Sequence, residues 1–207
     1  MSHPLPTGFV HLNAIDPTIL QDVRYATSNN FVGNPIDGYL AHTIICTEPC
    51  ALALRAVQQH LEGFGLGLKV FDGYRPQQAV HHFYRWGQDS GDDRMKHDYY
   101  PTLTKQEIFE GGFLARSKSA HTRGSAVDLT IVNLSDGAEL PMGTIFDFFG
   151  PQSHVRYADL PAQVRANRSF FEAVMTQYGF EGYKAEWWHF TLKDEPFPDT
   201  YFDFPVM

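Results

Sequence analysis

Cysteine is scarce in this chain of 207 residues, which contains only Cys46 and Cys50. Two cysteines cannot form a disulfide framework, and they are too few for a cysteine-rich zinc site. A disulfide between the two is not expected on these compositional grounds. We therefore expect two small free thiols, buried or half-buried in the fold.

Positive charge is also limited. The chain has 16 lysines and arginines against 24 acidic residues, which gives a net charge of −8 with neutral histidines. The basic residues are nowhere concentrated enough to bind a phosphate backbone, so the sequence predicts no nucleic acid partner. A modest negative charge is typical of soluble proteins and identifies no partner.

Long apolar stretches are missing as well. No run approaches the ~20 apolar residues that a helix needs to cross a bilayer, so no membrane partner is expected. The segment from Met1 to Pro6 lacks a basic stretch followed by an apolar one, which is the pattern of a secretory signal peptide. The expected location is cytoplasmic, although a chain already trimmed of a leader would look the same and leave the periplasm open.

Aromatic residues, in contrast, are abundant. They make up 14% of the chain, with 17 Phe and 10 Tyr, which predicts an aromatic-rich core and aromatic pocket walls. Hydrophobic residues at 43% and charged residues at 19% are ordinary for a globular protein. The length suits one domain, and no repeat, low-complexity segment or linker interrupts it. We therefore expect a single domain over residues 1–207.

Strands and helices are expected to follow one another irregularly. Apolar spacing and turn signals predict strands at 10–12, 66–71, 126–134 and 187–192. Helices are expected from a Thr47 cap to Gly63, after Pro76, after a capping box of Thr104 and Glu107, and over 160–178. Long loops are expected at 25–39, 87–101 and 141–158. Because no regular βαβ repeat is present, the expected fold class is α+β.

The stretch Ser-Ala-His-Thr-Arg-Gly-Ser-Ala-Val-Asp, residues 119–128, contains a candidate metal-binding pair. His121 offers a ring nitrogen and Asp128 a carboxylate oxygen, and both are good zinc ligands. In a straight strand, positions seven residues apart point to opposite faces. Gly124 between them can adopt backbone angles closed to other residues, and a bend there can turn both side chains toward one point. The alternative is a hydrogen-bonded turn without a metal, which such short matches often mark.

A third ligand is expected from Glu186-Trp187-Trp188-His189. His189 can bind a metal, and Glu186 can handle protons. Three protein ligands leave a fourth position for water, which is the arrangement of a catalytic zinc. We expect Glu186 in the turn before the strand, from which it can reach over the metal. The alternative for this segment is a structural strand with a histidine at the edge of the core.

Arg75 lies at a predicted junction between a strand and a helix, where side chains often face a cleft. Arginine stays charged and holds a rigid fork of donors, so it can stabilise negative charge developing on a carbonyl oxygen. A surface ion pair is the alternative role, and such pairs are common. With a metal-activated water and Glu186 as base, these residues point to hydrolysis of an amide bond.

Taken together, these motifs resemble the zinc D-alanyl-D-alanine dipeptidases of the VanX type. The shared pattern is Ser119-x-His121-x-x-Gly124-x-Ala126-x-Asp128 followed by Glu186-x-x-His189. The likeness covers nearly the whole chain, and its further segments are Arg24-Tyr25-Ala26-Thr27, Asp37-Gly38-Tyr39, Asp72-Gly73-Tyr74-Arg75-Pro76, Met142-Gly143-Thr144, Phe146-Asp147-Phe148 and Tyr201-Phe202-Asp203-Phe204-Pro205. This breadth is more specific than the short metal motif, which other metallo D,D-peptidases and hedgehog-like domains share.

The resemblance implies a single α+β domain of the hedgehog and D,D-peptidase type, with a central antiparallel sheet flanked by helices. It implies one zinc ion per chain, held by His121, Asp128 and His189. Glu186 would act as general base and acid, and Arg75 would stabilise the transition state. The residues that it places around a small substrate cavity are Tyr25, Tyr39, Ser119 and Asp147.

The reaction implied by the resemblance is zinc-dependent hydrolysis of the dipeptide D-alanyl-D-alanine, which removes or recycles peptidoglycan precursors. The partner would be this small dipeptide, and a homo-oligomer is left open. One rival is a zinc D,D-carboxypeptidase that acts on longer cell-wall peptides, but it needs an open cleft, whereas the loops at 25–39 and 141–158 look able to close a small cavity. The other rival is a non-catalytic zinc-binding module of hedgehog-like shape, which would need neither Glu186 nor Arg75.

Overall fold

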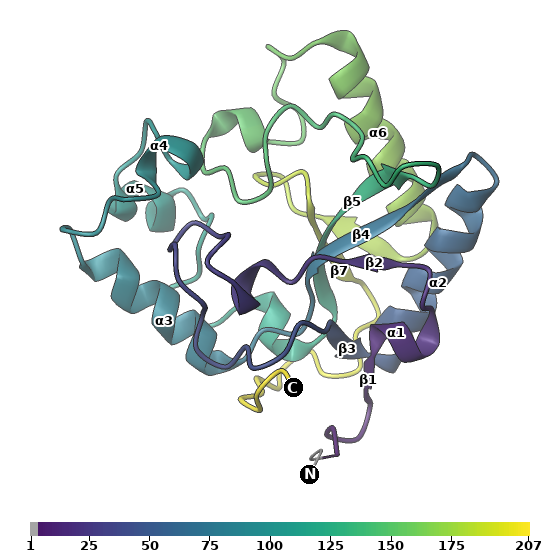
Figure 1. Ribbon diagram of the computed structural model, residues 1–207, viewed down its shortest axis with the longest axis horizontal. Coiled ribbons are helices and arrows are strands. Elements are labelled where there is room, and N and C mark those ends of the chain that lie inside the picture. The colour runs from purple at the N-terminus through teal and green to yellow at the C-terminus, as the bar shows by residue number, and fades with distance from the viewer. Residues whose placement is uncertain (1–3) are drawn as a thin grey trace.

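A sheet of five strands forms the centre of the computed structural model, which describes residues 4–207 (Figure 1). In spatial order the strands are β2 (Leu20–Gln21), β4 (Leu66–Asp72), β5 (Ala126–Asn133), β7 (His189–Leu192) and β6 (Phe180–Gly182). β2 runs parallel to β4, and the other neighbours are antiparallel. This arrangement confirms the expected α+β class with a central antiparallel sheet.

The helices form two groups. α2 and α6 lie together beside the sheet, where His60 Nδ1 is 3.0 Å from the Tyr178 hydroxyl, and α3, α4 and α5 form a separate group at the left of Figure 1. The bounds of the helices are α1 (Leu12–Ile15), α2 (Glu48–Glu62), α3 (Gln77–Gln88), α4 (Lys96–Tyr99), α5 (Lys105–Glu110) and α6 (Ala162–Gln177).

A smaller sheet pairs β1 (Phe9–His11) antiparallel with β3 (Ile45–Thr47). The strand predicted at 10–12 is therefore shifted by one residue, and Leu12 begins α1 instead. Leu12 is fully buried, so it joins the core from a helix as effectively as from a strand.

The two helix starts predicted from capping residues have different outcomes. α2 follows Thr47 and ends before Gly63, as predicted, but Thr47 makes no side-chain cap. Its hydroxyl oxygen instead lies 2.7 Å from Ser125 Oγ in the neighbouring segment. The capping box at α5 is confirmed: the Thr104 hydroxyl accepts from the Glu107 N–H, and the Glu107 carboxylate accepts from the Thr104 N–H.

Part of the loop predicted at 87–101 is helical, because α4 occupies Lys96–Tyr99. Its mostly polar residues give no apolar periodicity, so the pattern does not indicate a helix. The next residue, Tyr100, is buried, and its ring packs edge-on against Trp86 with 5.5 Å between centroids. This tertiary contact stabilises a segment whose composition is that of a loop.

The last predicted strand begins later than expected, since β7 starts at His189. Trp187 and Trp188 lie in the preceding turn, although both are buried. The Trp187 backbone N–H donates to Ser153 O at 3.1 Å, and its indole N–H donates to the Thr144 hydroxyl at 2.8 Å. These bonds hold Trp187 against another loop, while the Trp188 carbonyl still accepts from the Leu129 N–H of β5 at 3.1 Å. The short strands β2 and β6 were not predicted, because segments of two and three residues show no period.

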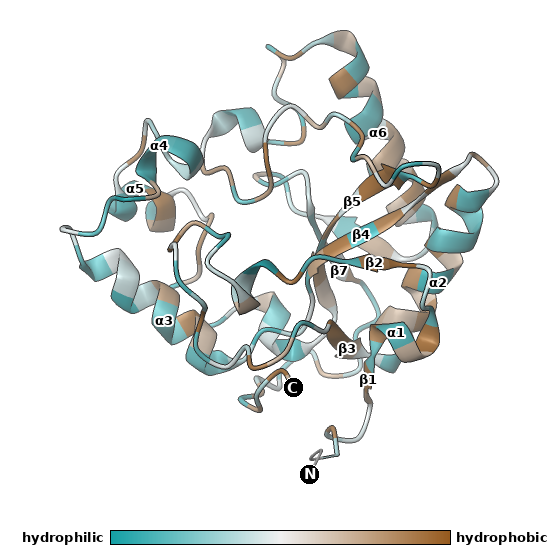
Figure 2. Cartoon of the chain, viewed as in Figure 1, coloured by the Kyte–Doolittle hydropathy of each residue, from teal (hydrophilic) through white to brown (hydrophobic). Residues whose placement is uncertain are grey.

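Aromatic rings fill much of the core, as the composition predicts. Phe31 is fully buried, and its ring lies 4.9 Å from Phe83 and 5.1 Å from Trp86. Figure 2 shows apolar colours along β4 at the centre and alternating colours on the surrounding helices. Cys46 and Cys50 are buried and unbonded to each other, which confirms the expected free thiols. Within residues 4–207, no helix combines the length and apolarity needed to cross a membrane.

Candidate active site

Gly124 makes the bend that the sequence predicts between His121 and Asp128. The 3-10 helix η2 (Ala120–Arg123) carries His121, and Gly124 follows it with a φ of +87°. A Cβ atom at this position would lie 2.3 Å from a ring carbon of Phe9, so backbone angle and packing both require glycine. β5 then returns Asp128 to within reach, with 3.3 Å between its Oδ1 and His121 Nε2.

The pairing of β5 with β7 brings in the third predicted ligand. Asp128 lies directly opposite His189 in the antiparallel register, so both side chains point to the same face. His189 Nδ1 is 3.0 Å from Asp128 Oδ1 and 3.1 Å from His121 Nε2. Two segments far apart in the chain thus place three metal-binding side chains together, within 4.8 Å of one another.

The donor set fits a zinc ion. Ligand atoms of tetrahedral zinc, each about 2.0–2.1 Å from the metal, stand about 3.3 Å apart. The three separations here are 3.0, 3.1 and 3.3 Å. The second nitrogen of each ring has its own partner: His121 Nδ1 is 2.8 Å from Gly73 O, and His189 Nε2 is 3.3 Å from Thr191 Oγ1. Partners of this kind orient metal-binding histidines.

Burial and charge favour the protonation states that bind a metal. Burial alone would raise the pKa of Asp128, but His121 and His189 hold that pKa well below its ordinary value. Burial also lowers the pKa of His189, which favours its neutral form. A carboxylate and a neutral imidazole are the forms that coordinate a metal.

Glu186 lies in the turn between β6 and β7, as the sequence predicts, and its Oε2 is 3.9 Å from His189 Nδ1. The side chain is buried. Burial raises the pKa of Glu186 well above its ordinary value, Asp128 and Asp147 raise it further, and Arg75 opposes the shift. A carboxyl group with a raised pKa can accept and return a proton near neutral pH.

Arg75 is buried just beyond β4, with 7% of its surface exposed, so the alternative of a surface ion pair is wrong. Its Nε donates to Asp72 Oδ2 at 2.9 Å, and its Nη2 donates to Asp128 Oδ2 at 3.3 Å. The guanidinium also lies 5.1 Å from the ring centre of Tyr25 and 5.2 Å from that of Phe83. These contacts fix a permanent cation next to the candidate metal centre.

A small cavity of about 220 Å³ opens onto this centre. In it the Tyr25 hydroxyl donates to Asp147 Oδ2 at 2.9 Å, and Ser119 Oγ accepts from the His121 N–H at 3.3 Å. Burial raises the pKa of Asp147 well above its ordinary value, and Asp128 raises it further. The predicted site residues that line the cavity are Tyr25, Arg75, Ser119, His121, Asp128, Asp147, Glu186 and His189.

Tyr39 is the one predicted site residue that does not line this cavity. Its partner, Asp72, is also absent from the lining. The Tyr39 hydroxyl donates to Asp72 Oδ1 at 2.6 Å. Asp72 is fully buried, also accepts from Arg75, and has its Oδ2 3.6 Å from His121 Nδ1. Sequence reasoning gave Asp72 no role. The sequence did contain a signal for Asp72, because it is an acidic residue at the end of a strand, three positions before Arg75.

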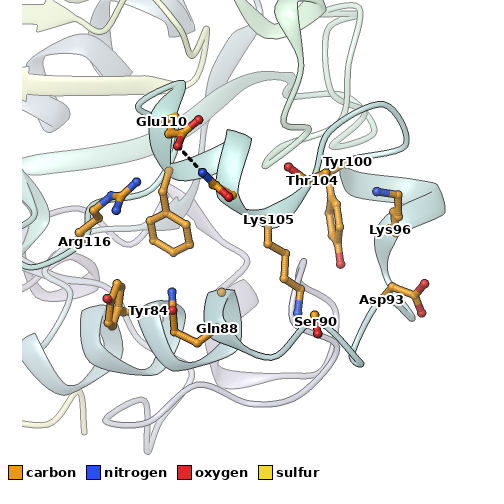
Figure 3. Close-up of a pocket in the computed structure, with 13 residues that line it drawn as sticks. Tyr84, Gln88, Ser90, Asp93, Lys96, Tyr100, Thr104, Lys105, Glu110 and Arg116 are labelled. Carbon is orange, nitrogen blue, oxygen red and sulfur yellow. Dashed lines mark hydrogen bonds between the residues drawn. The ribbon is translucent and has the colours of Figure 1, made fainter.

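A larger cavity of about 600 Å³ lies among α3, α4 and α5 and contains none of the predicted site residues (Figure 3). Lys105 Nζ donates there to Trp86 O at 2.9 Å and to Asp89 O at 2.6 Å. The Gln106 side chain donates to Glu110 at 2.7 Å. These bonds engage Lys105 and Gln106 with the protein itself, and the three candidate metal ligands lie in the smaller cavity.

Comparison with known proteins gives full-length matches. The chain matches the family described as D-ala-D-ala dipeptidase over residues 6–207. A D-alanyl-D-alanine dipeptidase of Streptomyces coelicolor is 44% identical over 96% of this chain and 98% of the relative. One of Enterococcus faecalis is 42% identical over 98% of this chain and 100% of the relative. One of Escherichia coli is 31% identical over 90% of this chain and 85% of the relative.

Solved structures give a more distant likeness. A vancomycin-resistance D,D-pentapeptidase in complex with Zn(II) is similar with a TM-score of 0.44 and 14% identity, over 75% of this chain and 76% of that one. A similarity of this size does not bear on the site.

Proposed function

The chain belongs to the D-ala-D-ala dipeptidase family and is a peptidase, and from this premise we propose that it hydrolyses the dipeptide D-Ala-D-Ala with one zinc ion. The observation that carries the proposal is the convergence of His121, Asp128 and His189, with ligand atoms 3.0–3.3 Å apart. Glu186 and Arg75 line the same cavity. The reaction removes or recycles the dipeptide in peptidoglycan metabolism.

Zinc held by His121, Asp128 and His189 would supply an acidified water and polarise the scissile carbonyl. Glu186 would take the proton from that water as its oxygen attacks the carbonyl carbon. The same carboxyl group would then pass the proton to the departing nitrogen as the C–N bond breaks. Two molecules of D-alanine result. The raised pKa of Glu186 suits a group that serves both steps.

Arg75 is a buried cation that lines the cavity beside the proposed metal ligands. It is held in place by Asp72 and by Asp128, so its position is set before substrate arrives. A preorganised donor stabilises an oxyanion without the reorganisation that water would need. We therefore assign the stabilisation of the transition state to Arg75.

Asp147 is the group proposed to bind the ammonium of the dipeptide. It is buried, lines the cavity and already accepts a hydrogen bond from Tyr25. The cavity volume of about 220 Å³ is below the roughly 300–1,000 Å³ of ordinary ligand pockets. The ammonium of a bound dipeptide would oppose the burial that raises the pKa of Asp147 and would favour its carboxylate form. A buried acid in a small cavity favours a free dipeptide over a longer peptide.

The test is to incubate the purified protein and zinc with D-Ala-D-Ala, and separately with a pentapeptide ending in D-Ala-D-Ala, and to assay free D-alanine. We expect release from the dipeptide and not from the pentapeptide. Comparable rates on both would favour a carboxypeptidase, and no release from either, with zinc bound, would leave a non-catalytic zinc module.

A further inference from the structure

Among residues 4–207, no acidic side chain pairs with Arg168 on α6, which is 2% exposed. Burial lowers its pKa to about 10. Its three hydrogen bonds all go to backbone carbonyls: Nε to Met142 O at 2.7 Å, Nη1 to His154 O at 2.7 Å and Nη2 to Gln152 O at 2.9 Å. A buried charge of this kind persists only when strong hydrogen bonds offset its desolvation.

The three carbonyls belong to the two ends of one loop, residues 142–154. Arg168 therefore forms hydrogen bonds with both ends of this loop. The loop also packs closely on α6, because a Cβ at Gly143 would lie 2.9 Å from a side-chain carbon of Val164. The planar guanidinium fork suits three bonds in fixed directions, which lysine cannot reproduce. Arg168 therefore fixes the loop's ends to the helix.

Asp147 lies in the middle of this loop, in a backbone conformation that needs support. Its φ is +62°, and it is the one non-glycine residue with positive φ in the described part of the chain. Non-glycine residues stay in that region only when the surroundings hold them there. This geometry turns the Asp147 carboxylate toward Tyr25 in the cavity.

The same loop is joined to the turn that carries Glu186. Ser153 O accepts from the Trp187 N–H at 3.1 Å, and the Thr144 hydroxyl accepts from the Trp187 indole at 2.8 Å. Trp187 directly follows Glu186 in the chain. The loop thus contacts the residue that follows the proposed base, and it also carries the proposed ammonium ligand.

We propose that Arg168 is a positioning residue for substrate recognition, which holds loop 142–154 so that Asp147 can bind the ammonium of the dipeptide. This inference rests on the proposed function. Arg168 touches no substrate and lies outside the cavity lining. It acts through Asp147, so its removal weakens the binding of substrate more than the chemical step.

The perturbation is Arg168→Met, which keeps the length and apolar stem of the side chain and removes all three bonds. The matched control is Arg165→Met, because Arg165 is exposed on the same helix and also donates to a carbonyl, Ala158 O at 2.8 Å, outside the loop. We expect Arg168→Met to lower kcat/KM for D-Ala-D-Ala by about 10–100-fold, mainly through KM, as a displaced binding group does. Arg168→Lys should recover part of the loss, and Arg165→Met should match the parent.

A double-mutant cycle with Asp147→Asn separates positioning from general support of the fold. If Arg168 acts through Asp147, Arg168→Met should add little to the loss already caused by Asp147→Asn, because the two changes remove the same interaction. Fully additive losses would overturn the proposal. So would an unchanged KM for Arg168→Met in protein that is folded and loaded with zinc.

Hydrogen exchange of the loop amides provides a readout without catalysis. We expect residues 143–154 to exchange faster in Arg168→Met than in the parent or in Arg165→Met, with other segments unchanged. If the parent failed to cleave the dipeptide, the proposed function would fall, while faster exchange confined to the loop would still support the loop-holding role. Unchanged exchange in the loop would overturn that role whatever the activity.

Discussion

Replacing Glu186 by glutamine tests the proposed chemistry most directly. The substitution keeps the shape of the side chain and removes the proton acceptor. General acid–base catalysis contributes typically ~10²–10⁴-fold, and one residue here would serve both the attack of water and the departure of the amine. We therefore expect kcat to fall by about 10⁴-fold, which corresponds to about 5 kcal/mol in the activation free energy.

The structure also predicts that this variant keeps its fold and its metal. Glu186 Oε2 is 3.9 Å from His189 Nδ1, beyond hydrogen-bond distance, so the substitution removes no ligand or close bond of the metal centre. Burial and the carboxylates of Asp128 and Asp147 disfavour its charged form. A neutral amide removes that repulsion, so the thermal unfolding temperature should not fall.

The assay compares D-alanine release, zinc content by metal analysis and thermal unfolding for the parent and Glu186→Gln. The expected result is full zinc occupancy, an unchanged or higher unfolding temperature, and a loss of turnover near 10⁴-fold. Near-normal turnover with zinc bound would refute the assignment of Glu186 as base, even though the family membership would stand.

Three further changes test the neighbouring groups. His121→Ala should remove zinc itself, and full zinc occupancy in that variant would contradict the ligand assignment. Arg75→Ala should keep zinc and lose roughly 10²–10³-fold in kcat, if it acts like one oxyanion donor, as steady-state kinetics would measure. Tyr39→Phe leaves buried Asp72 without one of its donors, so denaturant unfolding should show a loss of about 1–3 kcal/mol in stability. An unchanged unfolding free energy would argue against the supporting role of Tyr39.

The local geometry of the candidate metal centre could be predicted because few alternatives exist for it. A glycine between His121 and Asp128 is the one residue able to bend the segment back, and the structure has the predicted bend with φ of +87°. Glu186 could be placed in a turn because Gly182 precedes it and a bulky strand segment follows. These inferences needed only residue chemistry and short-range spacing.

The surroundings of the site could not be predicted in the same way. Asp72 and Tyr39 meet across 33 positions of sequence, and no local pattern marks that pairing. Arg168 looks like an ordinary charged residue of a helix, since its burial depends on a loop that folds over it. Short elements such as β2 and α4 exist because of tertiary contacts, so their own residues carry little signal.

The pairing of β5 with β7 has a consequence for the order of events during synthesis. His121 and Asp128 emerge from the ribosome before His189, but two ligands do not complete the proposed zinc site. The third arrives only with His189, and it reaches Asp128 only when the β5 and β7 backbones align in register. A nascent chain ending before residue 189 therefore lacks the third ligand of the proposed zinc site. On this proposal, the complete site forms only when β7 pairs with β5.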